Sequence, residues 1–142
     1  MSKVLAICIS EKKGTGKYEI DEARLIKDFG IENDAHGGNW HRQISLLGFE
    51  KIDDFRSRGA NVDFGAFGEN LVIEGIELEK LPIGQQIKIG ETLLEVTQIG
   101  KECHTRCAIF YQVGDCIMPR NGIFAKVIEE GTIRVGEDCS LI

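Results

Sequence analysis

Short apolar segments separated by glycine-containing turns run through most of this sequence. In the second half, residues 92–99 alternate in polarity before Gly100, residues 123–128 are mainly apolar, and residues 132–135 precede Gly136. Apolar segments of this length and alternation are typical of β-strands. The chain also holds 17 glycines, a residue that barrel corners and bulges use heavily. The sequence therefore predicts a mainly β fold, a curved sheet or barrel with a few helices packed outside it.

The first half contains fewer clear elements. Residues 4–10 predict a buried first strand, and residues 42–47 predict a strand that projects Arg42 from its beginning. Apolar side chains recur every three residues in 49–58, which predicts a helix. Residues 20–29 fit neither period, so a short helix and a strand pair both remain open there.

Composition limits the class of protein. A chain of 142 residues fits one domain, residues 1–142, and its net charge of -6 argues against nucleic acid as a partner. The apolar runs are too short to span a membrane, so we expect a cytoplasmic protein with no membrane partner. The five cysteines are an odd number, which favours reduced thiols over a disulfide framework. Cys8 and Cys139 are predicted to be packing or incidental thiols.

The segment 103–124 concentrates reactive side chains, with three of the five cysteines and one of the three histidines. Thiolates are soft and nucleophilic, so this density suggests a soft metal, sulfur chemistry or a redox step. Cys107 precedes the apolar run 108–111 and is predicted to pack in the core. Cys103 and Cys116 have polar or turn-forming neighbours and are the candidates for chemistry.

The turn around Gly37 and Gly38 is the first candidate binding loop. Both glycines are expected to be able to take positive φ and to bring the backbone close to a ligand. His36 and His41 flank the turn. Each could be an ordinary surface or turn histidine, or it could contact an anion or a cofactor. Trp40 could stack on a planar ligand or serve as a loop aromatic.

A second glycine-rich loop covers residues 64–70. Glu69 and Asn70 stand directly before the predicted strand 71–73, where they either hydrogen-bond a polar ligand or close the turn. The loop that ends at Lys17 has part of a phosphate-loop pattern, but it lacks the first glycine and the Ser or Thr that binds magnesium. We therefore expect a solvated loop there.

Several of these segments together resemble the MOSC domain, which is named for the C-terminal part of molybdenum cofactor sulfurase. The matching segments are RQISLL at 42–47, GENL at 68–71, PIG at 82–84, the cysteine segment 103–124 and GTIRVG at 131–136. They follow the family's order over nearly the whole chain, and the length is similar to that of the stand-alone bacterial form. The resemblance implies a MOSC-type β-barrel.

The resemblance also implies a role in binding or carrying the molybdenum cofactor (molybdopterin) or sulfur destined for it. Such domains are thought to present a cysteine that carries sulfur as a persulfide or ligates molybdenum as a thiolate. By position, Cys116 is the first candidate for the reactive cysteine and the molybdenum ligand, and Cys103 is the second. The implied partners are enzymes of cofactor biosynthesis or sulfur donation.

The cofactor's phosphate and pterin imply further contacts. A phosphate calls for arginine, lysine or exposed backbone amides, and a pterin edge needs directional donors and acceptors. The resemblance therefore nominates His36, Arg42, Glu69, Asn70 and Arg120 as cofactor-binding residues.

Two other functions remain open. The first is a small molybdenum-dependent oxidoreductase that reduces N-hydroxylated substrates, as some larger members of the family do. The second is a structural zinc module built from Cys103, His104, Cys107 and Cys116, although adjacent Cys103 and His104 rarely reach one tetrahedral ion together. No tightly bound pyridoxal phosphate is expected, because no lysine is nominated to form its Schiff base.

Overall fold

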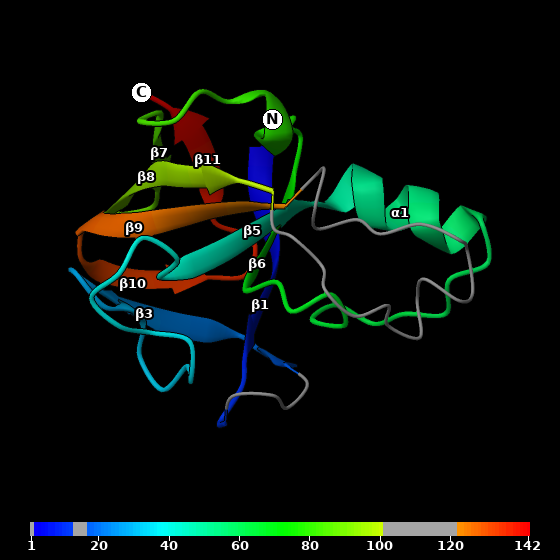
Figure 1. The fold of residues 1–142 in the computed structure, drawn as a ribbon, viewed down its shortest axis with the longest axis horizontal. Helices are drawn as coiled ribbons and strands as arrows, with labels where there is room; N and C mark the ends of the chain where they lie inside the picture. The colour runs from blue at the N-terminus through cyan, green and yellow to red at the C-terminus, as the bar shows by residue number, and fades with distance from the viewer. Residues whose placement is uncertain (1, 13–16, 101–121) are drawn as a thin grey trace.

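β-strands dominate the computed structural model, which describes residues 2–12, 17–100 and 122–142 (Figure 1). These parts contain one α-helix, α1 (Phe49–Ser57), and one short 3₁₀ helix, η1 (Leu78–Lys80). The strands are β1 (Ser2–Ile9), β2 (Tyr18–Ile20), β3 (Glu22–Ile26), β4 (Gly30–Ile31), β5 (Ile44–Gly48), β6 (Leu71–Glu74), β7 (Gln86–Ile89), β8 (Thr92–Ile99), β9 (Ile123–Glu129), β10 (Gly131–Arg134) and β11 (Asp138–Leu141).

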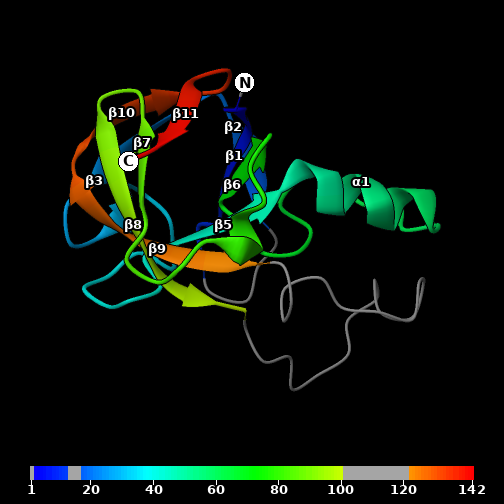
Figure 2. The ribbon, with the colours of Figure 1, turned by 90° about the horizontal axis from the view of Figure 1, so that it is seen from above.

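Seven strands close into a barrel, visible from above in Figure 2. Their order is β11-β7-β8-β9-β5-β6-β1, and β1 closes the ring by pairing with β11 through Ser2 with Cys139 and Lys3 with Asp138. The described pairings are antiparallel except β5 with β6. β2 extends the sheet from β1, and β10, β3 and β4 form a separate small sheet. The predicted β-barrel is confirmed.

The segment 20–29, which the sequence left open between a helix and strands, contains the last residue of β2 and the whole of β3. In β3, Ala23 and Leu25 are buried while Arg24 between them is exposed. This alternation is the two-residue period of a strand with one face on the core.

β5 is buried along its whole length because both of its faces are covered. Ile44 and Leu46 belong to the core inside the barrel. Leu47 belongs instead to an outer core beneath α1, together with Ile52 and Phe55. The helix thus covers a second hydrophobic core outside the barrel. Fully burying one side chain of this size contributes roughly 1.5–3 kcal/mol to the free energy of folding.

The predicted helix is confirmed as α1, which lies outside the barrel in Figures 1 and 2. Gly59 follows it with a φ of 104°, a left-handed conformation that stops the helix and that glycine adopts without strain. No helix in the described ranges is long and apolar enough to cross a membrane.

Candidate functional site

A pocket of about 100 Å³ lies where the loops before β5 and β6 meet the start of β9. It brings together residues that are far apart in the sequence. Its lining consists of Lys17, His36, Trp40, Arg42, Ser45, Phe67, Gly68, Asn70 and Phe124. Three of the nominated cofactor-binding residues therefore line the same pocket: His36, Arg42 and Asn70.

A buried ion pair contributes Lys17 to the pocket lining. The Lys17 ammonium lies 3.0 Å from Oδ1 of Asp34, and the two side chains are only 3% and 0% exposed. The Asp34 carboxylate also accepts hydrogen bonds from the backbone N–H of Ser10 at 3.1 Å and from Nδ2 of Asn70 at 3.1 Å. A buried ion pair persists only when such hydrogen bonds offset its loss of hydration.

Asn70 ties this ion pair to the barrel wall. Its Nδ2 donates to the carbonyl of Cys8 at 2.9 Å as well as to Asp34, and its Oδ1 accepts from the backbone N–H of Ser45 at 2.9 Å. The amide thus connects β1, β5 and the turn after β4. Its side chain is a structural crosslink that also lines the pocket.

The expectation of a solvated loop is wrong for Lys17. Its ammonium is buried by Asp34, Ser10 and His36, at 3.0 Å from Oδ1, 3.4 Å from Oγ and 3.0 Å from Nδ1 respectively. The physical reason is a close approach by the second glycine-rich loop, since a Cβ at Gly65 would lie 2.8 Å from the Lys17 carbonyl oxygen. Sequence reasoning missed Lys17 and Asp34, because neither has a neighbour in the chain that signals burial.

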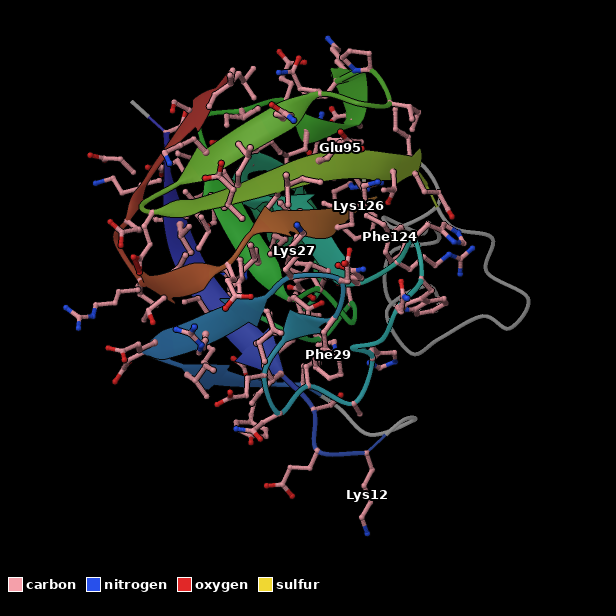
Figure 3. The ribbon with its side chains drawn as sticks, turned by 90° about the vertical axis from the view of Figure 1, so that its left-hand side faces the viewer. Lys12, Lys27, Phe29, Glu95, Phe124 and Lys126 are labelled. Atoms are coloured by element: carbon pink, nitrogen blue, oxygen red, sulfur yellow. The ribbon has the colours of Figure 1, made fainter. Side chains whose placement is uncertain are left out.

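Arg42 is held in place from two sides. Its Nε donates to Oε1 of Gln98 at 3.0 Å, and its guanidinium lies over the Phe124 ring, 5.2 Å from the centroid. Figure 3 shows Phe124 near the start of β9, beside the loop that precedes β5. Gln98 is itself fixed, because its Nε2 donates to the Gly100 carbonyl at 2.8 Å.

The same amide oxygen also contacts His41. Nε2 of His41 lies 2.9 Å from Oε1 of Gln98, and because an amide oxygen only accepts, Nε2 donates this hydrogen bond. His41 is exposed and supports Arg42 through Gln98, but it is not among the residues that line the pocket.

Glu69 is buried beside the pocket. Its Oε2 accepts from the backbone N–H of Gly65 at 2.9 Å, and its Oε1 accepts from that of Phe67 at 3.0 Å. Burial raises the pKa of this carboxyl, although the backbone hydrogen bonds act in the opposite direction. Among the described residues, the hydrogen-bond partners of the Glu69 carboxylate are backbone N–H groups of its own loop. These contacts are those expected of a residue that closes the turn.

Gly37 and Gly38 were expected to be able to take positive φ, but neither glycine adopts it in the structure. Their N–H groups donate to the carbonyls of Asp34 and Phe29 at 3.1 and 2.7 Å. Gly37 is required for a different reason: a Cβ there would lie 2.5 Å from the ring of Phe29, which is labelled in Figure 3. The turn is built on close packing against an aromatic ring.

The structure confirms that Cys8 and Cys139 are packing thiols. Both are buried, and burial is the largest cause that raises the pKa of each thiol to about 12. A thiol in this state does not form the thiolate that nucleophilic attack or metal binding needs.

The remaining nominated residues lie outside the described part of the chain. These are Cys103, Cys116 and Arg120, together with His104 and Cys107 of the zinc alternative. Within residues 2–12, 17–100 and 122–142, no group of three His, Cys, Asp or Glu residues is arranged to hold a metal ion.

Residues 32–140 match the MOSC domain, which is most of the chain, and the chain therefore belongs to the MOSC domain family. MOSC domains are of the molybdenum cofactor sulfurase type and are associated with the molybdenum cofactor. None of the curated proteins compared with the chain matches it.

Solved structures share the fold. The YuaD protein from Bacillus subtilis is similar with a TM-score of 0.82 and 18% identity, over 99% of this chain and 96% of that one. YiiM from Geobacillus stearothermophilus has a TM-score of 0.73 and 18% identity, over 100% and 75% of the two chains. YiiM from Escherichia coli has a TM-score of 0.67 and 21% identity, over 99% and 69%.

Proposed function

We propose that this protein binds the molybdenum cofactor, or carries sulfur destined for it, with the pocket as the cofactor contact. The observation that carries the proposal is the charge of the pocket lining. It contains the guanidinium of Arg42, and none of its described residues is a carboxylate. Such a lining favours an anionic ligand, and membership of the MOSC family supplies the class of that ligand.

The residues of the pocket suit a phosphorylated, flat ring system. Arg42 donates through Nε to Gln98, and no described residue accepts from its two terminal NH₂ groups, which have the fork geometry that suits a phosphate. Trp40, 43% exposed, and the rings of Phe67 and Phe124 supply apolar surface for a planar group. In this proposal Arg120 adds a second cation, and Asn70 holds the wall in shape.

The sulfur chemistry is assigned to Cys116, with Cys103 as the second candidate. When bound, the cofactor supplies a soft molybdenum centre, for which a cysteine thiolate is a suitable ligand. As a carrier, the thiolate would attack the outer sulfur of a donor persulfide. It would gain that sulfur as its own persulfide and release the donor's thiolate, so that no external oxidant or reductant is needed. The proposed partners are accordingly sulfur-donor or cofactor-synthesis enzymes.

The test is elemental and sulfane-sulfur analysis of protein purified anaerobically from a host that makes the cofactor. We expect near-stoichiometric molybdenum or persulfide in the wild type and its loss in Cys116→Ser, with Cys103→Ser as the comparison. Arg42→Ala should retain molybdenum about ten- to a hundredfold less tightly, because it loses a charge-assisted contact. Arg134→Ala, at an exposed arginine that does not line the pocket, is the matched control.

A wild-type protein with neither molybdenum nor persulfide would overturn the proposal. So would a Cys116→Ser, Cys103→Ser double variant that keeps both. Stoichiometric zinc in place of molybdenum would support the zinc module instead.

A further inference from the structure

An irregularity near the end of β8 determines where Gln98 points. Buried side chains occupy every second position of this strand up to Val96, so continued alternation would turn Gln98 toward the core inside the barrel. In the pairing with β9, however, Val96 lies opposite Ala125. Gln98, two positions further, lies opposite Phe124, the direct neighbour of Ala125. Thr97 is therefore an extra residue on β8, which makes this position a β-bulge.

The bulge lets two consecutive side chains of β8 reach the same segment, the residues that precede β5. The Thr97 hydroxyl hydrogen-bonds the carbonyl of His41. Oε1 of Gln98 accepts from Nε of Arg42 at 3.0 Å and from Nε2 of His41 at 2.9 Å. Neighbouring side chains of a regular strand point to opposite faces, so these shared partners mean that the bulge has redirected Gln98. Gln98 therefore lies beside Arg42, which lines the pocket.

The orientation of the Gln98 amide follows from the chemistry of its partners. An arginine Nε–H can only donate a hydrogen bond, and a backbone carbonyl can only accept one. The atom that faces Arg42 is therefore the amide oxygen, and the atom that faces the Gly100 carbonyl at 2.8 Å is the amide nitrogen. Both lone pairs of the oxygen are used, one by Arg42 and one by His41. Gln98 thus holds Arg42 with an acceptor that carries no charge.

A neutral acceptor affects an arginine differently from a carboxylate. Arg134 donates to the carboxylate of Glu22, which compensates its charge. Arg42 contacts the Gln98 amide and the ring of Phe124, 5.2 Å from the centroid, and neither group carries a net charge. The guanidinium of Arg42 is therefore fixed in direction, while its positive charge stays available to a ligand in the pocket.

We propose that Gln98 is a positioning residue that makes the pocket selective for anions, because it holds Arg42 without neutralising it. Lys17 also lines the pocket, but its ammonium is already paired with Asp34. The charge that remains for a ligand is thus that of Arg42, whose two terminal NH₂ groups suit a phosphate-like oxyanion. The proposal rests on the proposed function in one respect, that the pocket binds an anionic ligand.

The first test measures the affinity of the full chain for inorganic phosphate by titration calorimetry at about pH 7, where the carboxyl of a Gln98→Glu variant is ionised. This variant keeps the shape of the side chain and the acceptor for Arg42, but it pairs the guanidinium with a carboxylate. We expect it to lower the affinity about tenfold or more, as Arg42→Ala should. Gln98→Met keeps the length of the side chain and adds no charge, so it should lower the affinity only about two- to fivefold.

The order of these two variants separates charge from structure. Gln98→Met loses both the acceptor for Arg42 and the donor to the Gly100 carbonyl, whereas Gln98→Glu loses only the donor. A purely structural role would therefore make Gln98→Met the weaker binder of phosphate. That order would overturn the proposal, as would equal affinities of Gln98→Glu and the wild type.

Arg56→Ala is the matched control for the loss of an arginine. Arg56 also donates through Nε to a neutral acceptor, the Val62 carbonyl at 3.2 Å, and it lies over the Phe64 ring, 4.8 Å from the centroid. It does not line the pocket, so its removal should leave the phosphate affinity unchanged. Equal losses in Arg56→Ala and Arg42→Ala would contradict the assignment of the anion to the pocket.

A second readout follows the orientation of Arg42, in ¹H–¹⁵N spectra of the arginine Nε–H groups. Arg42→Ala identifies the Arg42 signal. Exchange of this proton with water should be slow in the wild type and in Gln98→Glu, which keep the acceptor, and faster in Gln98→Met. If Gln98→Met does not fold, Gln98→Ala serves in its place. Unchanged exchange in the variant without an acceptor would overturn the positioning role.

Molybdenum content and phosphate affinity distinguish the role of Gln98 from the proposed function. A wild type without molybdenum or persulfide that still binds phosphate through Arg42 and Gln98 would overturn the proposed function and leave the role of Gln98 in place. A wild type that holds molybdenum but binds phosphate no more tightly than Arg42→Ala would overturn the role of Gln98 alone.

Discussion

Two ion pairs of nearly equal length show how strongly burial controls electrostatics in this protein. Lys17 and Asp34 meet at 3.0 Å with side chains 3% and 0% exposed. Arg134 and Glu22 meet at 2.8 Å between β10 and β3, but their side chains are 71% and 53% exposed. Water screens the exposed pair, so it contributes little, whereas each member of the buried pair depends on the other. The N–O distance alone therefore does not indicate how much each ion pair matters for stability; burial has to be considered as well.

The largest effect should come from breaking the buried pair. Asp34→Ala leaves the Lys17 ammonium in a buried site without its carboxylate, which we expect to lower the free energy of unfolding by about 3–5 kcal/mol. Urea denaturation followed by circular dichroism measures this loss. The Lys17→Met, Asp34→Leu double variant is the control and should lose much less. A loss below about 1 kcal/mol in Asp34→Ala would contradict our view of the pair.

The next effect tests the amide that supports the buried pair. Asn70→Ala leaves the Cys8 carbonyl and the Ser45 N–H without their partner and removes a donor to Asp34, which should cost about 2–3 kcal/mol. Ser45→Ala removes a hydroxyl that donates to the Gly68 carbonyl and to Oδ1 of Asn70 and accepts from the Asn70 N–H, but it keeps the amide of Asn70, so it should cost about 1 kcal/mol. Denaturation of both variants gives the ranking, and a reversed order would be evidence against it.

A pH series tests the single buried carboxyl of the second loop. Because burial raises the pKa of Glu69 in the folded state above its ordinary 4.5, the folded protein holds this proton more tightly than the unfolded chain does. The contribution of Glu69 to stability should therefore fall as the pH rises from 4.5 through the raised pKa.

The measurement compares unfolding free energies of the wild type and Glu69→Gln, which cannot titrate, at several pH values from about 4 to about 7. The wild type should lose stability relative to the variant as the pH rises across this range. A relative gain would mean that the two backbone hydrogen bonds to Glu69 outweigh its burial.

The smallest effect should come from the exposed pair. Arg134→Ala should change the free energy of unfolding by less than about 1 kcal/mol, and added salt should reduce even that change. Denaturation at low and high salt measures it. A larger loss would show that β10 and β3 depend on this surface contact, and the contrast with the buried pair would weaken.

Much of the fold was predictable from local patterns. The alternation in residues 92–99 and the three-residue spacing in residues 49–58 report which face of an element meets the core, and β8 and α1 follow them. Residues 20–29 were ambiguous because their strands are short, and only pairing with β1 and β10 shows their form. The actual reason for glycine at position 37 was hidden for a similar cause, since the Phe29 ring that requires it lies eight positions earlier in the chain.

The candidate site was predictable only in part. His36, Arg42 and Asn70 were nominated from the sequence, and they do line one pocket. Gln98, which orients Arg42, lies 56 positions away, and no local motif marks it.

By itself, the sequence determined the strand and turn pattern, the family and the identity of the polar groups, because these depend on neighbours in the chain and on side-chain chemistry. Only the tertiary structure decided which polar groups are buried together. Packing of the loops before β2, β5 and β6 brings Lys17, Asp34 and Asn70 into contact and removes water from them. The loss of hydration turns an ordinary lysine and aspartate into a mutually dependent pair, and no residue carries that information alone.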